Sequence, residues 1–429
     1  MPADPSDLSL SEGARERQTA FSSLRHRDFR LLWTGQIVSV TGTQMQLVAI
    51  NWHIYLLTNS AFALGMVGLF RAGPIILCSL LGGVVADVID RRRLMVATQT
   101  VMLTCSGILA LVTFKGSQRV WPIYLLTAIA SAAWAFDTPA RQALVPALVP
   151  AKDFPNAVSL SMLMFQIGMI VGPALAGLLL ATRGPGLVYA TNAASFVAVI
   201  VGLALMRVRG RPAAEDGKAP RVSLEALMEG LRFVWHTPII VQTMTLDFVA
   251  TFLASANQLL PIFAKDILQV GAQGLGFLAS APAVGAVVAG LVMARLGALK
   301  RQGLIVILSV AVFGTATIAF GLSRVFWFSL VMLAVTGAAD TVSTILRHTI
   351  RQLSTPNNLR GRMTSINMIF FMGGPQLGEL EAGSVAALIG APLSVVTGGV
   401  GCLVAATIAL VAAKRLRGYE RGQETLGNG

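Results

Sequence analysis

The stretch that decides the fold of this chain is residues 82–95, GGVVADVIDRRRLM. An apolar segment with paired glycines ends at Asp87, and three arginines at positions 91–93 stand directly before a new apolar run. Two hydrophobic segments therefore meet across a short, strongly basic connection, and such basic residues mark the cytoplasmic side of a membrane. Because a carboxylate at the edge of hydrocarbon needs a partner, we expect Asp87 to face a helix N-terminus or a guanidinium.

The composition is that of an integral membrane protein. Of the 429 residues, 55% are hydrophobic and 12% are charged, whereas a soluble domain carries about 25% charged residues. The formal net charge of +13 is spread over short basic clusters between apolar runs, so it does not indicate a nucleic-acid partner. The three cysteines lie within apolar runs, and we expect neither a disulfide framework nor a metal site.

Twelve apolar runs are long enough, at about 20 residues each, to cross a bilayer. They predict an all-α integral membrane protein with twelve transmembrane helices in two pseudo-symmetric six-helix bundles. A polar stretch follows the sixth run, and the amphipathic segment after it is typical of a helix that lies in the membrane interface. The predicted divisions are a polar N-terminus (1–28), a first bundle (29–206), a linker with an amphipathic helix (207–237), a second bundle (238–413) and a tail (414–429).

The basic residues predict the orientation. With both termini in the cytoplasm, the cytoplasmic segments hold 27 of the 33 Lys and Arg residues, and the opposite segments hold five. Reversing the topology would invert this bias, which the positive-inside rule disfavours.

The two halves of the chain are weakly similar. The dipeptide Asp-Thr at 137–138 recurs at 340–341, and Gly-Pro at 172–173 recurs at 374–375. Parallel halves of six spans each are typical of secondary transporters. The chain has no phosphate-binding loop of an ATP-driven pump and no nucleophile with a base, so we expect an ion gradient as energy source, no catalytic residues and no cofactor.

The stretch at 82–95 resembles the loop between helices two and three of the major facilitator superfamily, G-x-L-A-D-R-x-G-R-R. The matching residues are Gly83, Asp87, Arg91 and Arg92. Asp90 replaces the motif's usual glycine. The resulting sequence, Asp-Arg-Arg-Arg, resembles that of the bacterial branch which includes the enterobactin exporter and related drug-efflux proteins. The stretch FDTPARQALVPALVP at 136–150 is similar to that branch as well. The resemblance covers about residues 21–415 and implies a multi-pass, monomeric transporter of the bacterial inner membrane.

Several charged residues share the depth of the cytoplasmic edge, where we expect a gate. The candidate gate residues are Gly83, Asp87, Arg91, Arg92, Asp137, Arg141 and Asp340. We expect Asp87 to meet the start of helix eleven. We also expect Arg91 to pair with Asp137 when the protein opens outward.

A second motif bears on the direction of transport. The fifth span reads GMIVGPALAG and is similar to the exporter motif of the superfamily, G-x-x-x-G-P-x-x-G-G, although Ala176 replaces one glycine. The matching residues are Gly168, Gly172, Pro173 and Gly177. Small residues at these positions allow close helix packing, and the proline bends the helix. Ordinary small-residue packing is the alternative interpretation.

Ionisable residues inside apolar runs are functional candidates, because hydrocarbon offers a charge no partner. The candidates for carrying a proton are Asp247, Glu379 and Glu381; the alternative is a buried ion pair that holds helices together. The candidate cavity residues are Arg71, Gln46, Trp52 and Asn257. We expect Arg71 to face the cavity, where its guanidinium either binds an acidic group of the substrate or keeps one of these carboxylates charged.

These features predict proton-coupled secondary export of a small hydrophobic or amphipathic molecule, such as a drug or a siderophore. The two halves would rock about a central cavity. Ion-coupled import of a nutrient and a membrane receptor without transport activity are the alternatives. The expected partners are the substrate, a proton and membrane lipid.

Overall fold

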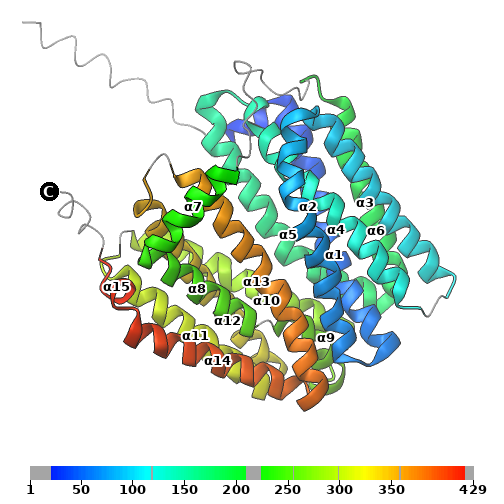
Figure 1. Ribbon diagram of the computed structural model, residues 1–429. Helices are drawn as coiled ribbons and strands as arrows, with labels where there is room; N and C mark the ends of the chain where they lie inside the picture. The colour runs from blue at the N-terminus through cyan, green and yellow to red at the C-terminus, as the bar shows by residue number, and fades with distance from the viewer. Residues whose placement is uncertain are drawn as a thin grey trace, which may run out of the picture.

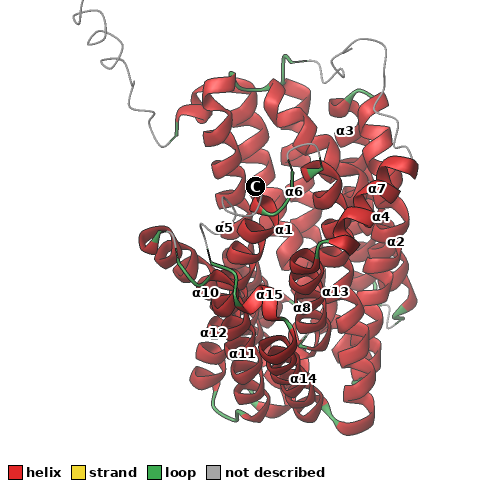
Figure 2. Cartoon of the chain, turned by 60° about the vertical axis from the view of Figure 1, so that its left-hand side comes forward, coloured by secondary structure: helices red, strands yellow, loops and turns green. Residues whose placement is uncertain are grey.

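The computed structural model describes residues 21–116, 119–208, 224–254, 256–297, 299–356 and 359–420. Within these ranges only the backbone is described for residues 79–84, 86–88, 224–227, 229–230, 256, 360–362, 364–366 and 368–373. The described part of the chain is helical and contains no strand (Figure 2). The predicted divisions at 1–28, 207–237 and 414–429 include residues outside these ranges.

Within the described ranges, twelve long helices form two groups that lie side by side (Figure 1). The first bundle holds α1 (Arg27–Thr58), α2 (Ala61–Val88), α3 (Arg91–Phe114), α4 (Trp121–Leu144), α5 (Phe154–Arg183) and α6 (Pro185–Leu205). The second bundle holds α8 (Pro238–Leu253), α10 (Gly271–Leu296), α11 (Gln302–Leu322), α12 (Phe326–Leu353), α13 (Arg360–Ile389) and α14 (Ala391–Ala412). The short helical elements are η2 (Ser22–Arg25), η3 (Val145–Ala147), η4 (Ala151–Asp153), α7 (Leu224–His236), η5 (Ala256–Leu259), α9 (Leu260–Ile262), the π-helical η6 (Phe263–Ile267) and α15 (Lys414–Arg417).

Most of the long helices are apolar enough to cross a bilayer. Within the described ranges, nine helical stretches have the required length and composition. The helices α1, α4 and α13 are not among these nine, although each has at least 24 residues. Polar side chains of α1 and α4 line the pocket described below, which explains why these two helices read as less apolar.

The stretch at 82–95 forms a two-residue turn between helices. The helix α2 ends at Val88, and α3 begins at Arg91. Asp90 caps α3, because its carboxylate accepts a hydrogen bond from the backbone N–H of Arg93 at 3.1 Å. The replacement of the motif's glycine by aspartate therefore has a local structural reason.

The two bundles touch along glycine-lined seams. A Cβ atom at Gly383 of α13 would lie 2.6 Å from the Cα of Gly65 in α2, and one at Gly276 of α10 would lie 2.9 Å from the Cα of Gly177 in α5. These helices can approach so closely only because both partners lack side chains. We call the end of the molecule at which α1 begins the basic end, because it carries the arginines at 27, 30 and 91–93. We call the opposite end, where the glycine seams lie, the closed end.

Three helices differ from the spans expected from hydropathy. Hydropathy predicts that the fourth span ends at Pro139 and the tenth at Ile345. The helix α4 continues to Leu144 and α12 to Leu353, so that Arg347 and Arg351 lie inside a helix rather than in a connecting segment. The expected seventh span is a broken one: α8 ends at Leu253, and η5, α9 and η6 complete the crossing. Pro261, which has no N–H to donate, stands in this irregular segment.

Candidate functional site

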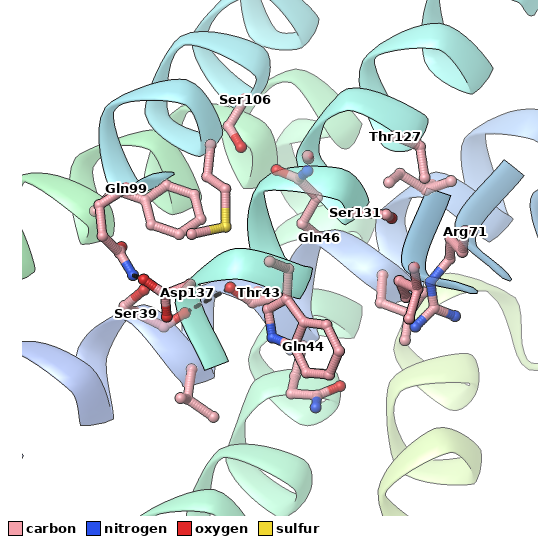
Figure 3. Close-up of a pocket in the computed structure, with 18 of the residues that line it drawn as sticks. Ser39, Thr43, Gln44, Gln46, Arg71, Gln99, Ser106, Thr127, Ser131 and Asp137 are labelled. Atoms are coloured by element: carbon pink, nitrogen blue, oxygen red, sulfur yellow. Dashed lines mark hydrogen bonds between the residues drawn. The ribbon is translucent and has the colours of Figure 1, made fainter. Parts of the chain in front are cut away.

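A large hollow lies on the inner face of the first bundle (Figure 3). It holds about 1270 Å³ of empty space, including the part that is open to solvent. Its lining comes from α1 to α6, and the second bundle adds Gln376 of α13. Trp134, Phe165 and Phe196 give it aromatic walls, while α1 contributes a row of polar side chains that includes Gln44. The pocket therefore combines an apolar body with polar groups on one wall.

Four polar atoms of this lining are buried and have no hydrogen-bond partner in the described part of the chain. They are Gln36 Nε2, Gln99 Oε1, Thr127 Oγ1 and Gln376 Oε1. An unpaired buried polar group costs about 1–3 kcal/mol. These atoms therefore mark positions where a bound molecule or water would gain hydrogen bonds.

A buried carboxylate stands at one side of the pocket and a guanidinium at the other. Asp137 is 2% exposed, and its Oδ1 accepts hydrogen bonds from Thr98 Oγ1 and Gln99 Nε2, each at 3.0 Å. Figure 3 shows Arg71 on the opposite side of the hollow. Arg141, one turn beyond Asp137, donates to Gln36 Oε1 at 3.3 Å. In the described residues no ion pair within 4 Å joins Asp137 to Arg141.

Arg71 also forms a contact between the bundles. Its Nη1 lies 3.8 Å from Oε1 of Glu379 in α13. The other carboxylate oxygen of Glu379 is buried without a hydrogen-bond partner. Gly68 makes room for this carboxylate, because a Cβ there would lie 2.7 Å from the Cβ of Glu379. Arg71 thus faces the pocket and a carboxylate at once, so the two options left open by the sequence do not exclude each other.

The second bundle contains a separate charged cluster. Arg347 Nη1 lies 2.6 Å from Asp247 Oδ1, and Arg347 Nη2 lies 3.7 Å from Asp340 Oδ1. The side chains of Arg347 and Asp247 are 2% and 8% exposed, whereas that of Asp340 is 50% exposed. Nearby, Arg351 Nη1 donates to Asn367 Oδ1 at 2.5 Å. Arg347 is not among the residues predicted from the sequence, although the spacing of positions 340, 347 and 351 places all three on one helical face.

The other predicted cavity and coupling residues are distributed more widely. Gln46 lines the pocket and accepts a hydrogen bond from Asn192 Nδ2 at 2.8 Å. Trp52 is buried in the core, Asn257 is exposed, and Glu381 is half-buried; these three lie outside the lining.

The glycines of the fifth span contact two different helices, α1 and α10. A Cβ at Gly168 would lie 2.6 Å from Val40 Cγ1, and one at Gly172 would lie 2.6 Å from Gln44 Cβ, so both positions press α5 against α1. Gly177 instead faces α10 of the second bundle, and a Cβ at Gly276 would lie 2.5 Å from the carbonyl oxygen of Pro173. The motif therefore connects the pocket-lining helix α1 with the seam between the bundles.

The arginines of the basic connection bind helix ends. Arg91 Nη1 donates to the carbonyl of Ala143 at 3.0 Å, and Arg92 donates to the carbonyls of Ala204 and Met206 at 2.9 Å each. These are orphan carbonyls of the last turns of α4 and α6. The side chains of Gly83 and Asp87 lie outside the described residues, as does the expected contact of Asp87 with α13. The pair Arg91–Asp137 is expected only in the outward-open form.

Polar side chains join the bundles at the closed end. The Tyr55 hydroxyl donates to Asp266, and Lys265 Nζ donates to Asn59 Oδ1 at 2.7 Å.

A second such bridge involves Gln258, which is not among the residues predicted from the sequence. Its Oε1 accepts from Asn51 Nδ2 at 2.9 Å, and its Nε2 donates to the carbonyl of Leu64 at 3.1 Å. The described hydrogen bonds and ion pairs between the bundles lie at this end or at mid-depth, so the pocket lies on their basic side.

Comparison with known proteins gives a consistent set of relatives. The profile of the transmembrane secretion effector family matches residues 18–425. The enterobactin exporter EntS of Shigella boydii serotype 18 is 28% identical over 399 residues, covering 92% of this chain and 94% of the relative. EntS of Escherichia coli O1:K1 is 27% identical with the same coverage.

Solved transporter structures have a similar fold. A POT family transporter in complex with 5-aminolevulinic acid aligns with a TM-score of 0.73 at 10% identity, over 91% of this chain and 96% of that one. A bacterial homologue of the human lysosomal transporter Spinster, in an inward-facing and unoccupied conformation, aligns with a TM-score of 0.71 at 14% identity, over 91% and 98% of the two chains. At these identities the likeness concerns the fold alone.

Proposed function

The chain belongs to the transmembrane secretion effector family of the major facilitator superfamily, and we propose that it exports a small amphipathic molecule from the cytoplasm. It is a multi-pass membrane transporter and not an enzyme. The observation that carries the proposal is the pocket of the first bundle, where unpaired polar atoms stand among aromatic walls. The relatives named as enterobactin exporters support a siderophore or a comparable amphipathic compound as substrate.

The charges of the pocket favour a substrate with an acidic or hydrogen-bonding part. Arg71 and Arg141 contribute two guanidiniums to the lining, against the single carboxylate of Asp137. Guanidinium groups bind carboxylates and other planar anions through paired hydrogen bonds. Trp134 and Phe196 would cover the apolar part of the same molecule.

We assign the basic end to the cytoplasm, because of its excess of Lys and Arg residues. In that orientation the pocket takes substrate from the cytoplasm, while the bridges made by Tyr55, Lys265 and Gln258 hold the opposite side shut. Export then requires these bridges to break and the basic end to close, with Asp87, Arg91 and Asp137 as gate residues. The rocking of two halves about a central site is the general scheme of such transporters.

Glu379 is the carboxylate whose position best suits proton coupling. It reaches from α13 to Arg71 of α2, so its charge contributes to holding the bundles together. Protonation would remove that charge and free Arg71 for the substrate. Asp247 is less suited, because Arg347 neutralises it within one bundle.

The direction of transport is tested in inverted membrane vesicles, which energisation makes acidic inside. Enterobactin and a neutral amphipathic dye are offered as substrates. A proton-coupled exporter accumulates at least one of them inside the vesicles, and a protonophore abolishes the accumulation. An importer would expel its substrate from such vesicles, and a receptor would produce no gradient-driven flux; either result contradicts the proposal.

The coupling role is tested by Glu379→Gln, with Glu381→Gln as a matched control two residues away in the same helix. We expect Glu379→Gln to lose accumulation against a gradient while downhill exchange continues. Unchanged accumulation in Glu379→Gln, together with loss in Asp247→Asn, would move the coupling site to the second bundle.

Arg71→Ala separates the two roles of the guanidinium. Loss of a substrate contact weakens binding of the anionic compound and leaves binding of the neutral dye unchanged. Loss of the pair with Glu379 shifts the pH profile of transport for both compounds.

A further inference from the structure

A second hollow lies away from the transport pocket, between α1 and α6 of the first bundle. It holds about 480 Å³ of empty space, and its lining is almost entirely apolar or small. Leu31, Thr34 and Gly35 line it from α1, and Val201, Gly202 and Leu205 line it from α6. Val201 is 48% exposed and Leu205 is 53% exposed, so the hollow opens on the outer surface of the bundle. We call it the α1–α6 trough.

The two buried glycines explain the shape of the trough. A Cβ at Gly202 would lie 2.9 Å from the carbonyl oxygen of Leu31, and a Cβ at Gly35 would lie 3.0 Å from the Cα of Val199. The two backbones are therefore in contact, and no side chain rises from the glycine positions. The surrounding side chains form the walls of the trough, and the backbone at Gly35 and Gly202 forms its floor.

Three arginines stand at the basic end of this trough. Arg27 and Arg30 belong to the first turn of α1, one turn before Leu31 and Thr34 on the same helical faces. Arg207 follows the last turn of α6. All three are exposed. Three basic side chains therefore start from the end of the trough at which α1 begins and α6 ends.

A buried carboxylate holds this end of the trough in place. Asp28 Oδ2 accepts hydrogen bonds from the backbone N–H groups of Arg207 at 3.0 Å and Val208 at 2.8 Å. It thereby fastens the chain after α6 to the first turn of α1. Asp28 Oδ1 lies 3.5 Å from Arg27 Nη1. This end of the trough therefore has three guanidinium groups and one carboxylate, and two backbone N–H groups already bind that carboxylate. The net charge of these four side chains is positive.

We propose that the trough is a binding site for an anionic phospholipid. One acyl chain lies in the trough, and the phosphate binds among Arg27, Arg30 and Arg207. Guanidinium groups suit the phosphate oxygens because they donate paired hydrogen bonds, and an acyl chain fits the apolar walls. The site does not rest on the proposed transport direction or substrate. It lies on the same helix as Gln36, so a bound lipid would steady one wall of the transport pocket.

The experiment measures lipid bound to the full-length protein. The protein is reconstituted in vesicles of phosphatidylcholine mixed with phosphatidylglycerol, re-extracted in mild detergent, and its retained lipid is quantified by mass spectrometry. We expect enrichment of phosphatidylglycerol over its share in the vesicles. The variant Arg27→Gln/Arg30→Gln/Arg207→Gln should lose this enrichment by about tenfold or more, the scale expected for several interfacial arginines.

Two matched controls make the result specific. The variant Arg295→Gln/Lys300→Gln/Lys414→Gln removes the same charge from the second bundle and should retain the lipid. Val201→Trp fills the trough and should lose the lipid as the arginine variant does. Val197→Trp, on the same helix, 46% exposed and outside the trough lining, should not lose it.

Each other outcome contradicts the proposal. If both triple variants lose enrichment equally, the protein attracts anionic lipid only through its general charge. If the arginine variant loses enrichment and Val201→Trp does not, the headgroup binds without the trough. If phosphatidylglycerol is not enriched on the unmodified protein, the trough holds no anionic lipid. Thermal unfolding of every variant identifies any that has lost its fold, and all the substituted positions are exposed.

Discussion

The two bundles carry aspartates in corresponding helices, α4 and α12, but these aspartates differ in burial and in their binding partners. In the first bundle, Asp137 of α4 is buried and bound by the neutral groups of Thr98 and Gln99. In the second bundle, the corresponding Asp340 of α12 is half-exposed, and the buried carboxylate is Asp247 of α8, bound directly to Arg347. The repeat therefore preserves the residue type and changes its environment.

This difference explains why the pocket described above lies in the first bundle. The ion pair of Asp247 and Arg347 joins α8 to α12, so these charges are used within their own bundle. Arg71 and Arg141 of the first bundle have no such partner inside that bundle among the described residues, and both line the pocket. Arg141 donates to the neutral Gln36, and Arg71 faces Glu379 across the bundles at 3.8 Å, so each guanidinium keeps further N–H donors for a ligand.

The largest effect is expected from Arg347→Met, which leaves the carboxylate of Asp247 buried without a counter-ion. Breaking such a pair costs about 3–5 kcal/mol of unfolding free energy. The thermal midpoint in detergent should fall steeply. Replacing both partners, as in Asp247→Leu/Arg347→Met, should restore most of the loss, while the exposed Arg295→Met serves as a control. A midpoint equal to that of the unmodified protein would mean that the pair does not hold the bundle together.

Asp137→Asn should affect transport far more than stability. The asparagine Oδ1 can accept the same two hydrogen bonds from Thr98 and Gln99, so the fold keeps its contacts. If the charge is required when the gate closes at the basic end, the transport rate should fall about tenfold, which corresponds to about 1.4 kcal/mol. The test is an initial rate together with a thermal midpoint. A large loss of stability would show that the first bundle, like the second, depends on its buried charge.

Thr127→Val tests whether the unpaired groups of the pocket bind substrate. The hydroxyl has no partner in the described structure, so removing it costs no internal hydrogen bond. A substrate that bonds to it should bind about 3–10-fold more weakly, the equivalent of about 0.5–1.5 kcal/mol. Binding is measured by calorimetry on the detergent-solubilised protein. Thr104→Val, on an exposed face of α3, is the control and should bind normally. Equal affinity in both variants would exclude Thr127 from the substrate site.

The smallest effect is expected at a partly exposed ion pair of the basic end, His26 Nε2 with Asp153 Oδ2 at 2.8 Å. The hydrogen bond from His26 is the main reason why the pKa of Asp153 lies below its usual range. A carboxyl group whose pKa is lower in the folded state stabilises that state at every pH above its unfolded-state pKa, which is about 3.9. This stabilisation is lost as the pH falls through the folded-state pKa.

His26→Ala should therefore lower the thermal midpoint slightly at neutral pH, and the difference should vanish at strongly acidic pH. The change in the thermal midpoint should be small because partly exposed ion pairs contribute little to stability. A difference that grows as the pH falls would reverse the assigned sign.

Part of the pocket lining could be predicted from the sequence. Of the four cavity candidates, Arg71 and Gln46 line the pocket, whereas Trp52 and Asn257 do not. Asp137 and Arg141 also line it, although they were expected at a gate. Asp247 is among the predicted buried carboxylates, but its partner Arg347 is not, because Arg347 stands beyond Ile345, where the apolar run of the tenth span ends. Hydropathy treats an arginine as the end of a membrane segment, whereas a buried counter-ion lets the helix continue past it.

The sequence by itself determined the class of protein, the approximate positions of most helical spans and the likeness of its halves, because these depend on composition, run length and motif. Only the tertiary structure decided which polar residues meet. Helical periodicity gives each helix a polar face, but it does not say which neighbour that face will contact. The pairing of Arg71 with Glu379 joins positions 308 residues apart, and the pairing of Tyr55 with Asp266 joins positions 211 residues apart. Both pairs exist only because glycine seams bring the two bundles together, and packing of that kind is a property of many helices at once.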